Sequence, residues 1–132
     1  MTERDKNWNG QNWIRPEKRL AIYLRDGLAC AYCGASVEDG AQMTLDHLRP
    51  HARGGENHET NLVTACKRCN CSRGKRSVRA FARATAEYLN HGATCEEIER
   101  HVRNCARRAL PKGEAKKLIA RRGSVSRVLA AM

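Results

Sequence analysis

Four cysteines, arranged in two pairs of identical spacing, give the clearest chemical signal in the chain. Cys30 and Cys33 form one C-x-x-C unit, and Cys66 and Cys69 form the second. Each unit places two thiolates on one side of a tight turn, and four thiolates satisfy a tetrahedral Zn²⁺ at about 2.3 Å per sulfur. Such a site is closed and leaves no coordination position for a reactant. We therefore expect one structural zinc ion per chain.

A second group of polar residues lies between and just after these cysteines. Asp46 supplies a carboxylate oxygen and Asn70 an amide oxygen, and both suit Mg²⁺, Mn²⁺ or another divalent metal. His47 titrates near neutral pH and can remove a proton from water for attack on phosphorus. Asn61 can hold His47 through its other ring nitrogen or through nearby backbone. The pattern indicates a hydrolytic site.

Short elements must bring these residues together. Residues 16–27 predict a helix that begins with Pro16 and ends at a glycine. Residues 43–47 and 61–65 are partly β-branched runs, which predict a hairpin with a long polar loop, and the chain turns helical after the second cysteine pair. Neighbours on a regular strand point to opposite faces, so Asp46 and His47 converge only where the strand ends or bends.

The sequence beyond residue 76 predicts further helices. One helix follows from apolar residues at helical spacing, and residues 90–92 end it. Thr94 and Glu97 have the spacing of a capping box at the start of the next helix. One or two short helices then surround Gly123. The apolar positions of the first of these helices are Val78, Phe81, Thr85 and Tyr88.

The remaining cysteines leave two interpretations open. Cys95 and Cys105 each follow a histidine by four positions, a pattern that could form a second metal site. Their spacing also fits an apolar helical stripe with Ile98, Val102 and Ala109, in which cysteine packs as a small hydrophobic residue, and we favour this stripe. Cys71 is outside both patterns.

Charge indicates a polyanionic partner. The chain of 132 residues has a net charge of +11. Residues 76–132 contribute most of it, with 13 basic and 5 acidic side chains against 12 and 9 in residues 1–75. A basic excess of this size raises the local concentration of nucleic acid around a small protein. We therefore expect nucleic acid as the partner.

Cellular location follows from what the composition excludes. No apolar run approaches the roughly 20 residues of a membrane helix, and the first residues lack the apolar core of a secretory signal. Seven cysteines, an odd number, argue against a disulfide framework. We expect a soluble cytoplasmic protein, bacterial or from a phage-infected cell, with no membrane contact.

Four stretches resemble a known family in order and spacing. "RLAIYLRDGLACAYCG", "LDHLRPHARGG", "NHETNLVTACKRCN" and "SRGKR" are similar to the HNH endonucleases, whose ββα-metal fold is also called the His-Me finger. The resemblance covers residues 16–76. It implies an α+β fold, with a ββα-metal domain stapled by the four-cysteine zinc. Outside it lie a flexible N-terminal arm at residues 1–15 and a basic helical extension at residues 77–132.

The resemblance also implies roles for the polar residues. His47 matches the general base and Asn61 the central asparagine that orients the site. Asn70 stands where the family often has histidine, and with Asp46 it would bind a single catalytic metal. The implied reaction is metal-dependent hydrolysis of DNA that leaves a 5′ phosphate.

Several basic residues are candidate DNA contacts. Arg53 lies beside two glycines and either clamps a phosphate or is a solvated loop charge, while the nearby His51 has no fixed role in the family. Arg100, Arg103, Arg107 and Arg108 extend the basic surface beyond the resemblance. The candidate contacts are Arg53, Arg73, Lys75, Arg76, Arg79 and Arg83.

Two other functions remain. A zinc-stabilised nucleic-acid-binding module without catalysis is the first, although binding alone does not need the four polar residues. The second is an interaction protein that uses residues 77–132 to dock on a larger assembly. The sequence does not fix the oligomeric state.

Overall fold

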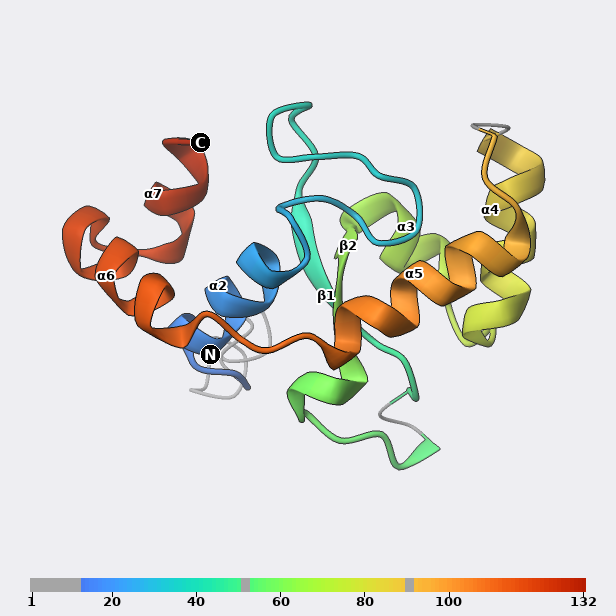
Figure 1. The fold of residues 1–132 in the computed structure, drawn as a ribbon, viewed down its shortest axis with the longest axis horizontal. Helices are drawn as coiled ribbons and strands as arrows, with labels where there is room; N and C mark the ends of the chain where they lie inside the picture. The colour runs from blue at the N-terminus through green and yellow to red at the C-terminus, as the bar shows by residue number, and fades with distance from the viewer. Residues whose placement is uncertain (1–12, 51–52, 90–91) are drawn as a thin grey trace, which may run out of the picture.

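The computed structural model describes residues 13–50, 53–89 and 92–132. Its elements are an α-helix α2 (Pro16–Arg25), strand β1 (Met43–His47), a short 3₁₀ helix η2 (Glu59–Asn61), strand β2 (Leu62–Cys66), and helices α3 (Lys67–Arg73), α4 (Val78–Leu89), α5 (Cys95–Arg107), α6 (Lys112–Arg122) and α7 (Val125–Ala130). Figure 1 shows the two strands near the centre, with α3 beside them. The predicted α+β fold is confirmed.

The two strands form an antiparallel hairpin. In its register Met43 pairs with Cys66 at one end and His47 pairs with Leu62 at the other. Every residue of β2 is buried, as expected for a strand covered on both faces. The hairpin therefore links the second cysteine pair at one end to the histidine at the other.

Helix α2 is fixed to β2 by a buried ion pair. The Arg25 guanidinium binds the Asp26 carboxylate and also donates to the Leu62 carbonyl at 2.6 Å. Asp26 in turn accepts from the backbone N–H of Thr64 at 2.8 Å. Burial of both charges is tolerated because each has several hydrogen-bond partners. These contacts set the position of β2 relative to α2.

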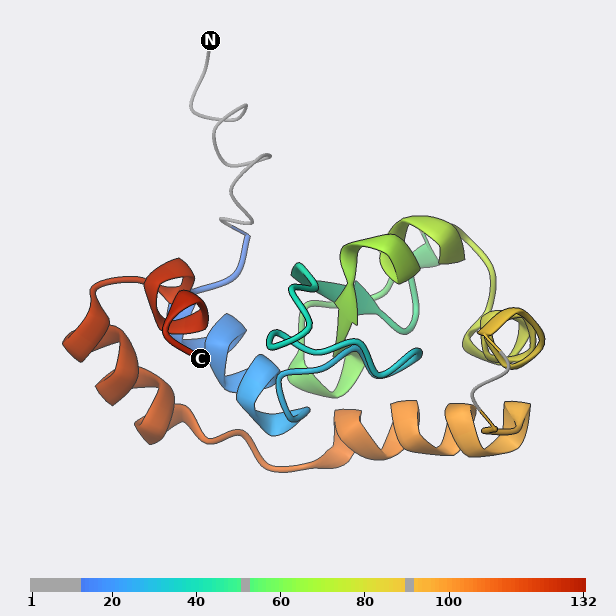
Figure 2. The same cartoon turned by 90° about the horizontal axis from the view of Figure 1, so that it is seen from above.

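The helices after α3 continue the same core. The predicted capping box is present at α5, where the Thr94 side chain accepts from the Glu97 N–H and Glu97 accepts from the Thr94 N–H. Helix α5 packs on α4, β2 and η2, while α6 and α7 pack on α2. Figures 1 and 2 show α4 at one end of the molecule, α6 and α7 at the other, and α5 running between them.

Some sequence predictions differ from the structure in detail. Strand β2 begins one residue later than expected because Asn61 closes η2. Tyr88 is 90% exposed although its spacing predicted a buried face, and the buried residues of α4 end at Thr85. Ala109 lies beyond the end of α5 and is exposed. Most of the predicted arm, residues 1–12, and His51 lie outside the described residues.

Within the described ranges, no helix combines the length and the apolar character needed to cross a membrane.

Candidate active site and metal centre

The four predicted cysteines form one cluster. Their sulfur atoms all lie within 4.8 Å of one another, and the Sγ atoms of Cys33 and Cys66 are 3.7 Å apart. A tetrahedral metal with bonds of about 2.3 Å to sulfur requires sulfur–sulfur distances of about 3.8 Å. The cluster therefore fits a four-thiolate zinc site.

Local structure explains the position of each pair. Cys66 is the last residue of β2 and caps α3, where its sulfur accepts from the Cys69 N–H at 3.4 Å. The first pair lies in a turn attached to the same strand, because the Ala31 N–H donates to the Thr64 carbonyl at 2.9 Å. Hydrogen bonding with Cys30 and Cys33 raises the pKa of Cys69, and hydrogen bonding with Cys30 and Cys69 lowers the pKa of Cys33.

The other cysteines do not join a metal cluster in the part of the chain that the structure describes. Cys105 is fully buried beside Ile98 and Val102, so this part of the predicted apolar stripe is present. The Cys105 sulfur lies 3.6 Å from His101 Nε2. Cys71 is exposed.

Asp46 lies at the end of β1 in a buried polar network. Its residue is 5% exposed, and Oδ2 accepts from the Tyr32 hydroxyl at 2.8 Å and from Arg73 Nη1 at 2.5 Å. Burial raises the pKa of Asp46, and the attraction of Arg73 offsets this only in part. Burial and the neighbouring Asp46 also raise the pKa of Tyr32. The hydroxyl therefore stays protonated and donates a hydrogen bond to the carboxylate.

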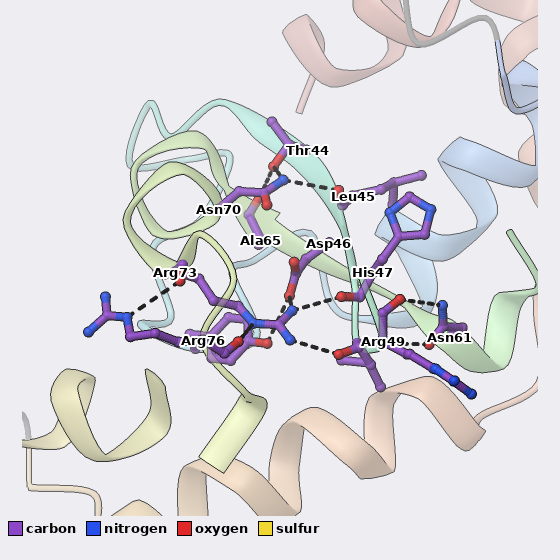
Figure 3. Close-up of polar contacts among 12 residues, drawn as sticks. Thr44, Leu45, Asp46, His47, Arg49, Asn61, Ala65, Asn70, Arg73 and Arg76 are labelled. Carbon is purple, nitrogen blue, oxygen red and sulfur yellow. Dashed lines mark hydrogen bonds and ion pairs between the residues drawn. The ribbon is translucent and has the colours of Figure 1, made fainter. Parts of the chain in front are cut away.

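The position of Arg73 argues against its predicted contact with DNA. The residue is 2% exposed, and its guanidinium also donates to the carbonyls of His47 at 2.8 Å, Leu48 at 2.7 Å and Arg76 at 2.9 Å (Figure 3). These contacts hold the end of β1 against α3. Arg73 is therefore not placed to reach a DNA phosphate, because burial and four internal partners occupy the side chain.

Asn70 lies on α3 and faces β1. Its amide nitrogen donates to Thr44 Oγ1 and to the Leu45 carbonyl, both at 3.0 Å. Thr44 and Asp46 are two positions apart on β1, so their side chains point to the same face, which Asn70 covers. Hydrogen bonds from the described residues leave Oδ1 of both Asp46 and Asn70 unused. Both atoms are hard oxygen donors of the type that divalent metals bind, and the Arg73 charge beside Asp46 weakens attraction for a cation.

His47 points away from this face. In Figure 3 its ring and the Asp46 carboxylate project to different sides of β1, as alternation along a strand requires. His47 Nε2 lies 2.8 Å from Asn57 Oδ1, and its ring centre is 5.0 Å from that of Trp13. When the Asn57 oxygen accepts, the neutral ring carries its proton on Nε2 and its lone pair on Nδ1.

Asn61 binds backbone rather than the histidine ring. Its Oδ1 accepts from the Arg49 N–H at 2.9 Å, and its Nδ2 donates to the carbonyls of Arg49 and Glu56 at 3.2 and 2.8 Å. The Asn61 carbonyl accepts from the Leu48 N–H at 2.8 Å. Asn61 therefore fixes the chain immediately after His47.

The remaining candidate DNA contacts are exposed side chains. Arg53, Lys75 and Arg83 lie on the surface. Arg76 stacks over the Phe81 ring at 5.1 Å, and Arg79 pairs with Glu99 at 3.3 Å. These exposed side chains lie on the loop after β1, at the end of α3 and along α4.

Sequence reasoning did not assign roles to Tyr32 or Asn57. Tyr32 stands inside the first C-x-x-C unit, where only the cysteines attracted attention. Asn57 occupies a long polar loop without periodicity, so no local signal identified it. A signal did exist for the inward face of Arg73, because it follows Asn70 by three positions on one helix.

Comparison with known proteins agrees with this geometry. Residues 30–85 match the family described as HNH endonuclease. The CRISPR-associated endonuclease Cas9 of Corynebacterium diphtheriae is 36% identical over 69 residues, which are 52% of this chain and 6% of that protein. The protein of the same name from Actinomyces naeslundii is 41% identical over 56 residues, which are 42% of this chain and 5% of that protein. The matched segments are thus a small part of both curated relatives.

Proposed function

Because residues 30–85 match the family described as HNH endonuclease, we propose that this protein is a metal-dependent endonuclease that hydrolyses phosphodiester bonds of DNA. The observation that carries the proposal is the end of the hairpin. There the Asn57 oxygen contacts the His47 ring, Asn61 fixes the chain that follows, and Asp46 and Asn70 present oxygen atoms from the α3 side.

In the proposed reaction His47 is the general base. Its Nδ1 takes a proton from the attacking water while Asn57 keeps the ring in one tautomer. Asp46 and Asn70 would hold the catalytic Mg²⁺, Mn²⁺ or another divalent metal, which supplies charge stabilisation for the phosphorane and the leaving 3′ oxygen. The product would carry a 5′ phosphate.

Zn²⁺ is the proposed occupant of the four-cysteine cluster, with a structural role. The cluster lies at the end of the hairpin opposite to His47, and its four thiolates complete a tetrahedral shell. It would hold α3, and with it Asn70, against the strands.

The alternative is a zinc-stabilised nucleic-acid-binding module without catalysis. The Asp46–Arg73 ion pair favours it to some degree, because the guanidinium lies where it weakens cation binding. This module would bind DNA without cutting it, whatever metal is added. Docking on a protein partner through residues 77–132 is a further proposal compatible with either function.

Supercoiled plasmid distinguishes the two functions. We expect the purified protein to nick or linearise it with Mg²⁺, Mn²⁺ or another divalent metal, and to lose this activity when no metal is added. His47→Ala should lose the activity, and His101→Ala is its matched control, because this exposed histidine lies on α5 and not on the hairpin. Absence of cleavage with every metal, together with retained DNA binding, would favour the non-catalytic module.

A further inference from the structure

A basic groove lies beside the proposed active site. The segment after β1, the start of α4 and helix α5 form its walls. Among the residues that the structure describes, none that lines the groove is acidic. Its polar lining consists of Arg49, Arg53, Thr60, Asn61, Ser77 and Arg103.

Arg49 and Arg53 both line the groove, and hydrogen bonds fix the backbone at Arg49. Asn61 binds both the N–H and the carbonyl of Arg49, and Arg49 Nε donates to the Arg53 carbonyl at 2.9 Å. Gly55 allows this close packing, since a Cβ at its position would lie 1.7 Å from the Arg49 carbonyl oxygen. A fixed guanidinium loses little conformational entropy when it binds an anion.

The third arginine comes from α5, outside the segment that matches the family. Helix α5 packs on β2 and η2, and this packing places Arg103 in the groove. Arg103 Nε and Nη2 both lie 3.2 Å from Glu99 Oε2, and Glu99 also pairs with Arg79. One carboxylate between two guanidinium groups leaves a net positive charge.

We propose that Arg49, Arg53 and Arg103 form a subsite for a backbone phosphate of DNA, adjacent to the bond that is cut. Leu48, which follows His47 in the chain, and Asn61 also line the groove, so the groove begins one residue beyond the proposed base. Guanidinium groups bind phosphate oxygens through paired N–H donors and read no base sequence. The subsite rests on the proposed nuclease function and gives α5 a role in holding the substrate.

Affinity for duplex DNA tests this subsite. Fluorescence anisotropy of a labelled duplex, in a His47→Ala background without added divalent metal, measures binding without cleavage. We expect Arg103→Gln and Arg49→Gln each to weaken binding about tenfold, the loss of one hydrogen-bonded ionic contact, and to lower the salt slope by about one. Arg103→Lys should retain the salt slope because it keeps the charge.

Arg100→Gln is the matched control, because Arg100 is exposed on the same helix and does not line the groove. Equal weakening by Arg100→Gln and Arg103→Gln, or wild-type affinity in Arg103→Gln, would overturn the subsite. Plasmid cleavage by the protein with intact His47 is measured in parallel. Groove-dependent binding without any cleavage would overturn the nuclease proposal and would leave the groove as a phosphate-binding site of a module that does not cut DNA.

Discussion

The two ends of the hairpin are built in different ways. At the end formed by Met43 and Cys66, four side chains of one type converge, and their spacing matches what one metal ion requires. At the end formed by His47 and Leu62, side chains of several types converge from distant segments, and most have protein partners. The first end is complete once a cation binds, whereas the second depends on contacts that hold each group in place.

The cysteine end is expected to contribute mainly to folding stability, and the histidine end mainly to the proposed reaction. A small domain gains folding free energy from a structural metal, since the apo ligands cannot replace it. The histidine end gains little stability from its exposed polar groups, and its buried Asp46–Arg73 pair is costly if one partner is lost. Variants at the two ends should therefore have effects of different kind and size.

The largest effect is expected at the cysteine end. Cys69→Ser removes one of four ligands and should abolish tight zinc binding, whose contribution to folding is on the order of 10 kcal/mol in small zinc domains. We expect loss of cooperative thermal unfolding by circular dichroism and no zinc by elemental analysis. Cys71→Ser is the control, because Cys71 is exposed and outside the cluster. A folded Cys69→Ser protein without zinc would show that the metal does not support the fold.

A smaller loss of stability is expected for Arg73→Met, which removes the ion pair at the histidine end and leaves the cysteine cluster intact. This variant leaves Asp46 as a buried unpaired carboxylate, which costs about 3–5 kcal/mol of unfolding free energy. Zinc content should stay unchanged, because the cysteines are at the opposite end. Chemical denaturation followed by fluorescence measures the loss.

The same variant has a predicted pH dependence. Burial raises the pKa of Asp46, and removal of Arg73 should raise it further. The protonated carboxyl is then favoured in the folded state, so the stability of Arg73→Met is retained at acidic pH and lost as pH rises through the raised pKa. A deficit relative to wild type that does not grow with pH would contradict the role of the ion pair.

The smallest effect on stability is expected for Asn57→Ala. This variant should instead lower the rate of DNA cleavage. Loss of the Asn57 oxygen removes one hydrogen bond that favours a single tautomer of the His47 ring, so we expect the cleavage rate to fall by about tenfold with little change in DNA affinity. Asn57→Asp keeps an acceptor and should retain more activity. Single-turnover cleavage of a labelled duplex separates rate from binding, and an unchanged rate in Asn57→Ala would remove Asn57 from the proposed mechanism.

The same contrast explains what could be predicted from sequence. The cysteine cluster, β1 and the capping box at Thr94 follow from local spacing, and the structure contains all three. The partners of the polar site do not, because Asn57 meets His47 across a loop and Arg73 meets Asp46 across 27 positions of chain. Arg73 was assigned to DNA from its charge, although its spacing from Asn70 placed both residues on one face of α3.

The roles of the four polar residues remain proposals. Their order along the chain indicated a hydrolytic site, and the structure places Asp46 and Asn70 on one side of β1 with the His47 ring directed elsewhere. This divergence follows from alternation along a strand, because β1 continues through His47 and both residues lie within it.

The most direct test of the central claim is metal-dependent DNA cleavage by His47→Ala. The account predicts that cleavage falls by at least about a hundredfold, as expected for loss of a general base, while zinc content, thermal unfolding and DNA affinity stay close to those of the wild type. Undiminished cleavage by His47→Ala would contradict the role of His47 and with it the proposed mechanism.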